Sequence, residues 1–207
     1  MKEHLFERKA ELLEAALLEF TERTYEDASL NSIIKNAGIS KGTFYYHFAD
    51  KQALYLFLLE RAAQAKWDFI NEKAAANPAF FAEQGIFELF KQQAKLGAEF
   101  AREHPKYHAL AQRLSGERER AAHIYSIAKE HLGGDTEDKM ESMVDAALER
   151  GELRDIFPKE FLVKVLSYCL NGFDVIFSKQ GDGDLDRMLE NLDRYLEFIR
   201  KGMGNNQ

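Results

Sequence analysis

Apolar residues recur along the chain at spacings of three and four, the repeat that gathers side chains on one face of an α-helix. At the start of the chain this repeat predicts a helix over residues 4–23. Its apolar positions are Leu5, Leu12, Leu13, Ala16, Leu17 and Phe20. The alternating pattern of a half-buried strand is nearly absent. The pattern therefore predicts an all-α protein.

The next segment carries signals for helix ends. Side chains of the types that cap helix N-termini stand at Ser29, Ser40 and Asp50. Gly38 is of the type that ends a helix. The sequence predicts three helices here, over residues 30–37, 41–47 and 51–76.

The helical repeat continues through the remainder of the chain. It predicts helices over residues 86–104, 105–114, 117–132, 136–150, 158–178 and 184–201. Gly133-Gly134 lies between residues 117–132 and 136–150, so these two segments are two helices or one broken helix.

Residues 44–48, with the sequence FYYHF, cannot all be buried in one helix, because each residue turns the chain by about 100°. With Phe44 placed at 0°, Phe48 falls at about 40°, Gly42 at about 160° and Tyr46 at about 200°. We therefore expect Phe44 and Phe48 to face inward. Their expected partners are Ile33, Ile34 and Ile39. The outward side, with Gly42 and Tyr46, is left to face a partner.

Two short helices joined by the tight turn Ala37-Gly38-Ile39 have the layout of a helix-turn-helix, in which the second helix enters the DNA major groove. A glycine on the outward side lets the helix backbone approach DNA closely, and Thr43 offers a methyl and a hydroxyl to base edges. The alternative is an ordinary helical hairpin in a core. We predict DNA contacts at Ser29, Ser40, Lys41, Gly42, Thr43, Tyr45, Tyr46, His47 and Lys51.

The distribution of charge along the chain favours a DNA contact at residues 30–51, although the total charge does not. The chain has a formal net charge of -7, which argues mildly against a nucleic-acid partner. Residues 30–51, however, hold Lys35, Lys41 and Lys51 against Asp50 alone, so the net charge of this segment is 3 - 1 = +2. Lys51 in a first helical turn opposes the helix dipole, which a docked phosphate would explain.

Residues 4–60 resemble the DNA-binding domain of the tetracycline-repressor (TetR) family of bacterial transcriptional regulators. The resemblance lies in LLEAALLEF followed by TY, and in SIIKNAGISKGTFYYHFADKQALY. It implies a helix-turn-helix domain over 1–50 and a ligand-sensing and dimerisation domain over 51–207. Where the family commonly has glycine before the tyrosine, this chain has Thr24 before Tyr25. A β-branched residue disfavours positive φ, so the end of the first helix is expected to be built differently.

The resemblance also implies a function. We expect a dimeric repressor that binds a palindromic operator in double-stranded DNA and is released by a small-molecule effector. The alternative is a DNA-organising or interaction module that uses the same helix-turn-helix without an effector. In the family the middle helices enclose the effector cavity, for which this chain offers Trp67, Phe90, Tyr107, His123, Tyr168 and Asn171.

The last two predicted helices suit a homodimer interface of four helices, two from each subunit. Residues 161–177 are apolar almost all round. The apolar face of the last helix comprises Leu185, Met188, Leu189, Leu192, Tyr195, Leu196 and Ile199. The alternative is that both helices close the core of their own subunit.

Other classes of protein find little support in the sequence. Nucleotide-binding, nucleophile-elbow and CxxC motifs are absent, so we expect no enzyme and no cofactor. His104 and His108 have a spacing that can bind metal, but no third ligand accompanies them, and we expect no metal site. The single cysteine, Cys169, is expected to be a packing thiol. Apolar runs are too short to cross a membrane, and the N-terminus lacks the pattern of a secretory signal. We expect a cytoplasmic protein.

Overall fold

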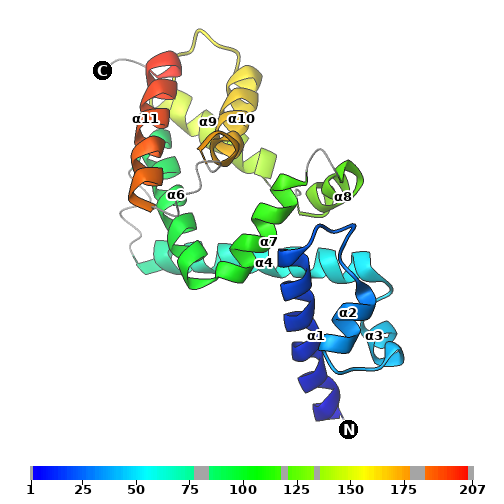
Figure 1. Ribbon diagram of the computed structural model, residues 1–207. Coiled ribbons are helices and arrows are strands. Elements are labelled where there is room, and N and C mark those ends of the chain that lie inside the picture. Colours follow the sequence, from blue (N-terminus) through cyan, green and yellow to red (C-terminus); the bar gives the residue numbers. More distant parts are fainter. Residues whose placement is uncertain (1, 77–83, 118–120, 133–135, 178–184, 205–207) are drawn as a thin grey trace. The chain divides into compact units, whose positions relative to one another are not determined.

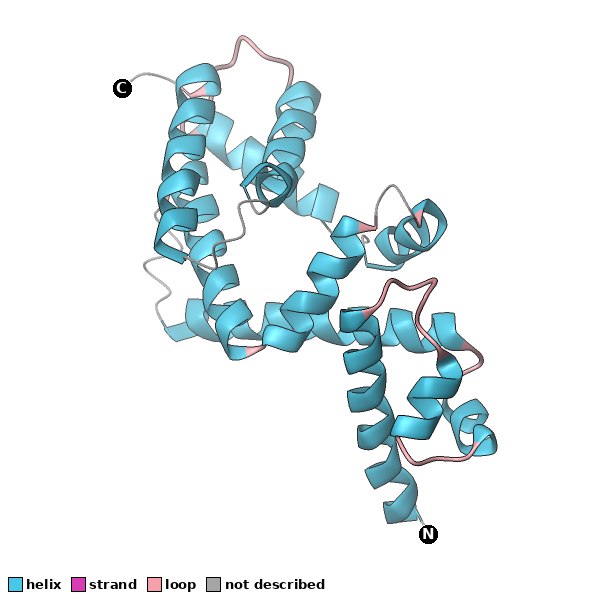
Figure 2. Ribbon diagram, viewed as in Figure 1, coloured by secondary structure: helices cyan, strands magenta, loops and turns pink. Residues whose placement is uncertain are grey.

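The computed structural model describes residues 2–76, 84–117, 121–132, 136–177 and 185–204 (Figures 1 and 2). The described residues form α-helices joined by short connections, and the only strand-like pairing among them is an isolated bridge between Leu153 and Gly204. The prediction of an all-α protein is therefore confirmed. The helices are α1 (Lys2–Glu22), α2 (Leu30–Asn36), α3 (Lys41–His47), α4 (Lys51–Ala76), α6 (Ile86–Glu103), α7 (Pro105–Gly116), α8 (Ala122–Leu132), α9 (Thr136–Glu149), α10 (Lys159–Phe177) and α11 (Leu185–Met203).

Helix starts near the N-terminus agree with the capping signals. The helices α2, α3 and α4 begin at the predicted residues, and the Asp50 carboxylate accepts a hydrogen bond of 2.8 Å from the amide of Ala53. A larger difference occurs at α8, which begins at Ala122 and not near residue 117. The reason is that Glu117 follows the end of α7 and turns its side chain into the interior, where only 2 % of it is exposed.

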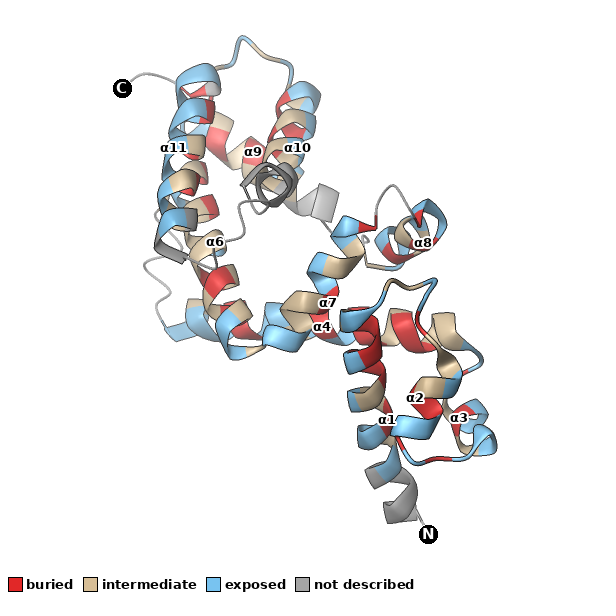
Figure 3. Cartoon of the chain, viewed as in Figure 1, coloured by how far each residue is buried: buried red, intermediate tan, exposed pale blue. Residues whose placement is uncertain are grey.

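The chain divides into two compact units, and the division falls within α4 and α6. The first unit comprises residues 1–69 and 100–132. Its core is made by buried side chains of α1, α2, α3, the first part of α4, α7 and α8 (Figure 3). The largest of these side chains include Phe20, Phe44 and Tyr55. The helix-turn-helix therefore shares one core with helices from the middle of the chain.

The second unit comprises residues 70–99 and 133–207. Side chains of α6, α9, α10 and α11 form its core, with Leu153 from the connection between α9 and α10. The Glu152 carboxylate accepts a hydrogen bond of 2.6 Å from the amide of Ile86 and so satisfies the start of α6. The two compact units differ from the predicted functional domains, residues 1–50 and 51–207. That functional division stays a prediction.

The apolar face of α11 lies inside the second unit. Leu192, Leu196 and Ile199 are buried, and Leu189 and Tyr195 pack against the same core. The side chains of Leu185 and Met188 lie outside the described residues. These described residues close the core of their own chain, which is the alternative given for them above. A homodimer through the last two helices stays a prediction. Large apolar side chains that remain exposed on α10 and α11 are Phe161, Tyr168 and Phe198.

Two further expectations concern single residues and membranes. Cys169 is half-buried and packs against the second core, and its carbonyl accepts a hydrogen bond of 2.8 Å from the Tyr195 hydroxyl. Among the helices of the described ranges, none is both long and apolar enough to cross a membrane.

Candidate nucleic-acid interface

The two short helices α2 and α3 are each fixed by a serine cap. The Ser29 Oγ accepts a hydrogen bond from the amide of Ser32 at 3.3 Å, and the Ser40 Oγ accepts one from the amide of Thr43 at 3.0 Å. Between them, Gly38 has φ +64°, a left-handed conformation that glycine adopts at little cost. The carbonyl of Gly38 also accepts a hydrogen bond of 3.2 Å from Arg8 on α1. The turn between α2 and α3 is thus fixed by the conformation of Gly38 and by its hydrogen bond to Arg8.

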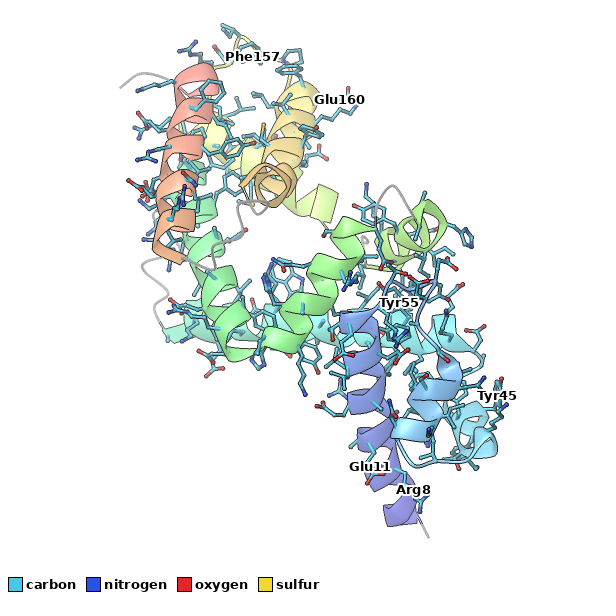
Figure 4. All side chains as sticks on the ribbon, in the orientation of Figure 1. Arg8, Glu11, Tyr45, Tyr55, Phe157 and Glu160 are labelled. Carbon is cyan, nitrogen blue, oxygen red and sulfur yellow. The ribbon has the colours of Figure 1, made fainter. Side chains whose placement is uncertain are left out.

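The side chains of α3 divide as the helical wheel predicts. Phe44 is fully buried and Phe48 nearly so, and both belong to the core that contains Ile33, Ile34 and Ile39. Tyr45 is 58 % exposed and Tyr46 is 74 % exposed. Figure 4 shows Tyr45 directed away from the neighbouring helices. The outward rings therefore have an open surface in front of them within the first unit.

Gly42 lies on this open surface. A methyl group at Gly42 would meet nothing closer than the Ser40 Oγ, at 3.6 Å. Packing within the first unit therefore does not explain why this position is a glycine. A partner that approaches the backbone of α3 closely would explain it.

Polar and charged groups surround the exposed face. Lys35 and Lys41 are exposed. The hydroxyl of Thr43, a half-buried residue, lies 2.9 Å from the Ser40 Oγ, so these two hydroxyls already form one hydrogen bond. The ring of His47 packs edge-on against Tyr46, and its Nε2 is buried with no hydrogen-bond partner among the described residues. A phosphate contact by His47 would therefore have to use Nδ1.

Lys51 differs from its predicted surroundings. Its ammonium donates hydrogen bonds to the carbonyls of Tyr25 at 2.7 Å and Ala28 at 3.0 Å, with Glu26 more distant at 3.5 Å. It also lies over the ring of Tyr25. A docked phosphate is therefore not needed to explain a lysine in this first turn, because the ammonium satisfies carbonyls of the loop between α1 and α2. A DNA contact by Lys51 stays a prediction.

The loop around Thr24 is built without positive φ at non-glycine residues, as far as the described chain extends. The Thr24 Oγ1 donates to the Asp27 carboxylate at 2.7 Å and accepts from the Asp27 amide at 3.2 Å. The side chain of Thr24 thus closes a short turn. This explains how the chain accommodates threonine where the TetR pattern commonly has glycine.

The residues predicted to line an effector cavity are distributed over both units. In the first unit Trp67 is 39 % exposed, Tyr107 is half-buried and His123 is exposed. In the second unit Phe90 is buried in the core and Tyr168 is 77 % exposed. Asn171 lies in α10, but its side chain is outside the described residues. A cavity that these residues share stays a prediction.

Each unit has a groove lined by described residues. The first, of about 200 Å³, runs over α1, α4 and α7 and is lined by Leu13, Leu17, Leu58 and Tyr107 among others. The second, of about 420 Å³, lies between α6 and α11. Only the second falls within the range of about 300–1,000 Å³ that is usual for small-molecule sites.

The histidine pair has neighbours other than metal ligands. The His104 ring lies 4.7 Å from the centre of the Phe100 ring and 6.2 Å from that of Tyr107. Throughout the described ranges, no three His, Cys, Asp or Glu side chains are grouped so that they could hold a metal ion.

Sequence reasoning missed two residues that bind the chain between α1 and α2. Arg113 and Glu117 at the end of α7 bind the backbone of residues 21–25. The separation along the chain is 92 residues for the pair Tyr25 and Glu117. Glutamate and arginine near a helix end look like ordinary surface residues, so the sequence offered no signal for this contact.

The helix-turn-helix region is similar in sequence to that of known regulatory proteins. Residues 12–57 match the family model described as bacterial regulatory proteins, tetR family. The HTH-type transcriptional repressor AcnR of Corynebacterium diphtheriae is 27 % identical over 210 residues, which cover 97 % of this chain and 93 % of AcnR. The HTH-type transcriptional activator FasR of Mycolicibacterium smegmatis is 44 % identical over 55 residues, or 27 % of this chain and 25 % of FasR.

Solved structures extend the likeness to the whole fold. The crystal structure of a TetR family transcriptional regulator from Chloroflexus aurantiacus superposes with a TM-score of 0.73 at 19 % identity. The match covers 99 % of this chain and 98 % of that one. At this identity the likeness shows that both chains have the same fold.

Proposed function

We propose that this chain, a member of the tetR family of bacterial regulatory proteins, is a dimeric repressor that reads its operator with α3. Proteins of this family are DNA-binding transcriptional regulators and not enzymes. The observation that carries this proposal is the open face of α3. Gly42 and Tyr46 point away from the core on the side opposite the buried Phe44.

The groups on the outward side of α3 can each contact DNA. The Thr43 methyl can contact a thymine methyl in the major groove, while the Tyr45 and Tyr46 hydroxyls can donate to phosphate oxygens. Lys41 adds a positive charge near the phosphates. Phosphate contacts fix the position of the helix on DNA, and base contacts select the sequence. We assign the phosphate contacts to the tyrosines and the base contact to Thr43.

The dimer places two copies of α3 on one face of the DNA. Recognition helices of a two-fold dimer lie about 34 Å apart, one turn of B-DNA, so the operator is a near-palindrome. We propose that the dimer forms through the last two helices. The exposed Tyr168 and Phe198 are its central contacts, because both are 77 % exposed and large apolar side chains of this kind are common at subunit interfaces.

A small-molecule effector releases the repressor from DNA, and the protein works in the cytoplasm, where it meets the operator. Within the second unit, the groove between α6 and α11 has the volume for such a molecule. Phe87 and Leu196 provide apolar surface there, and Lys91 forms an ion pair of 2.8 Å with Asp193 at its rim. An effector for this groove would combine an apolar body with a charged group.

Selection of bound fragments from a random DNA pool tests the proposed function. We expect the protein to enrich one near-palindromic sequence. Thr43→Ala should weaken preference at one base pair of each half-site by about 1–3 kcal/mol, whereas Tyr46→Ala should weaken binding to all sequences. Enrichment of no sequence would exclude a regulator that acts at a specific operator and would favour the DNA-organising alternative.

The dimer is tested separately by sedimentation at several protein concentrations. We expect Phe198→Glu to shift the protein from dimer to monomer, because a carboxylate in an apolar interface has no partner. Arg194→Glu, on the same helix and exposed, is the matched control. A dimer that survives both Phe198→Glu and Tyr168→Glu would rule out this interface.

A further inference from the structure

The loop of residues 23–29 between α1 and α2 is held by a buried carboxylate from the end of α7. The amide of Tyr25 donates to both oxygens of Glu117, at 3.0 and 3.2 Å. Glu117 is one of two charged residues found buried among the described residues, and only 2 % of it is exposed. A buried carboxylate directed at one backbone amide fixes the position of that peptide group.

The same end of α7 also holds the end of α1. Arg113 lies one helical turn before Glu117, and its Nη2 donates to the carbonyls of Thr21 at 3.0 Å and Glu22 at 3.2 Å. These carbonyls belong to the last turn of α1, which has no partners within its own helix. Arg113 and Glu117 therefore bind consecutive parts of the chain where α1 passes into the loop.

The loop in turn fixes the start of the helix-turn-helix. Its far end is Ser29, the cap of α2, whose amide donates to the buried Glu19 carboxylate at 2.9 Å. The Lys51 ammonium binds the carbonyls of Tyr25 and Ala28 from the other side. Both ends of the loop are thus bound. The helices α2 and α3 share one core.

Burial of the Glu117 carboxylate carries an energetic cost. Burial raises the pKa of Glu117 above its ordinary value, although the Tyr25 amide and the Arg113 guanidinium oppose the rise. Desolvation is thus the largest influence on this pKa. The ring of Tyr55 lies 4.9 Å from that of Tyr25, and its hydroxyl is buried with no hydrogen-bond partner in the described part of the chain. Buried polar groups left in this state often mark a functional constraint.

We propose that Arg113 and Glu117 are positioning residues for DNA recognition, which hold α2 and α3 in the arrangement that binds the operator without touching DNA themselves. This inference rests on the proposed function. In this proposal, the contact between α7 and the loop controls operator affinity. A shift of α7 along α1 breaks bonds to Tyr25, Thr21 and Glu22 together and lowers operator affinity.

The test compares Glu117→Ala with Glu117→Gln in the full-length protein, using the operator that the wild type selects. Hydrogen exchange at the amides of residues 23–29, operator affinity by fluorescence anisotropy and the thermal midpoint are measured for each variant. We expect Glu117→Ala to speed exchange and to weaken operator binding by about tenfold or more. Glu117→Gln, which keeps one acceptor oxygen for Tyr25, should recover part of both losses.

Two control variants separate positioning from stability. Glu103→Gln changes an exposed glutamate at the end of α6 and should alter neither readout. Leu110→Val removes one methylene from a fully buried residue of α7, so it lowers the thermal midpoint and leaves the hydrogen bonds of Arg113 and Glu117 in place. Leu110→Val should keep wild-type operator affinity at a temperature where both proteins are folded.

Three outcomes would overturn the inference. In the first, Glu117→Ala frees the loop amides but binds operator like the wild type, so the loop does not position α3. In the second, Leu110→Val weakens DNA binding as much as Glu117→Ala does at an equal loss of stability, so the role is structural only. In the third, the wild type selects no operator, and the proposed function fails together with the inference.

Discussion

The Lys51 ammonium lies 2.7 Å from the carbonyl oxygen of Tyr25 and 4.5 Å from the centre of the Tyr25 ring. One side chain thus joins the first turn of α4 to the loop that precedes α2. A charged donor that meets both a carbonyl and an aromatic face gains from a hydrogen bond and from the attraction of the cation to the ring. This pair anchors the helix-turn-helix to the long helix that follows it.

Replacing Lys51 with methionine keeps most of the side chain and removes the charge. We expect the free energy of unfolding to fall by about 1.5–3 kcal/mol, because bonds to a charged donor are lost and the carbonyl of Tyr25 loses a partner. Urea denaturation measures the change. Lys41→Met, at an exposed position of α3, is the control and should change stability by less than about 0.5 kcal/mol. Equal effects of the two substitutions would contradict the role given to Lys51.

Gly42→Ala should change stability and DNA binding in opposite directions. Alanine favours the helix by about 0.5–1 kcal/mol over glycine, and its methyl group meets nothing closer than 3.6 Å. The thermal midpoint should therefore rise. Operator affinity should fall, because the methyl group keeps the backbone of α3 away from DNA. If affinity stays at the wild-type level, α3 does not approach DNA through Gly42.

Gly38→Ala should destabilise the protein although the site has room. No atom lies within 4 Å of a methyl group placed there, but the backbone has φ +64°. An alanine in this left-handed region costs about 1–2 kcal/mol. Gly202→Ala in α11 is the matched control, since that glycine also has open space and lacks positive φ. Thermal melts should show a loss for Gly38→Ala and a gain for Gly202→Ala, and a gain at both sites would disprove the conformational explanation.

Glu117 should make stability depend on pH. Its pKa is raised by burial and, more weakly, by Glu26 and Asp27, against the opposing effects of the Tyr25 amide and Arg113. The folded protein therefore binds this proton more tightly than the unfolded chain does. The stabilisation is fully present below the ordinary pKa of a glutamate and is lost as the pH rises through the folded value.

The comparison with Glu117→Gln isolates this effect, because the variant cannot titrate at that position. The difference in unfolding free energy, wild type minus variant, should increase as the pH is lowered from 7 to about 5. Urea denaturation at a series of pH values gives both curves. A difference that stays constant or decreases over this range would show that the folded-state pKa of Glu117 is not raised.

The sequence by itself determined the helices and the face of α3. Caps at Ser29 and Ser40 and the glycine at 38 act through neighbours a few residues away, so their residue types suffice to place α2 and α3. The angular period of a helix then decides that Phe44 turns inward when Tyr46 turns outward. These are local rules, and the structure follows them.

Only the tertiary structure decided which distant residues hold that face in place. The contact between Glu117 and Tyr25 spans 92 residues, and a lone glutamate near a helix end carries no mark of its partner. The same holds for α11, whose apolar face fits a dimer or its own core equally well as a pattern, and which the fold places in the core. Amphipathic periodicity says that a face is buried, whereas the partner depends on how the whole chain packs.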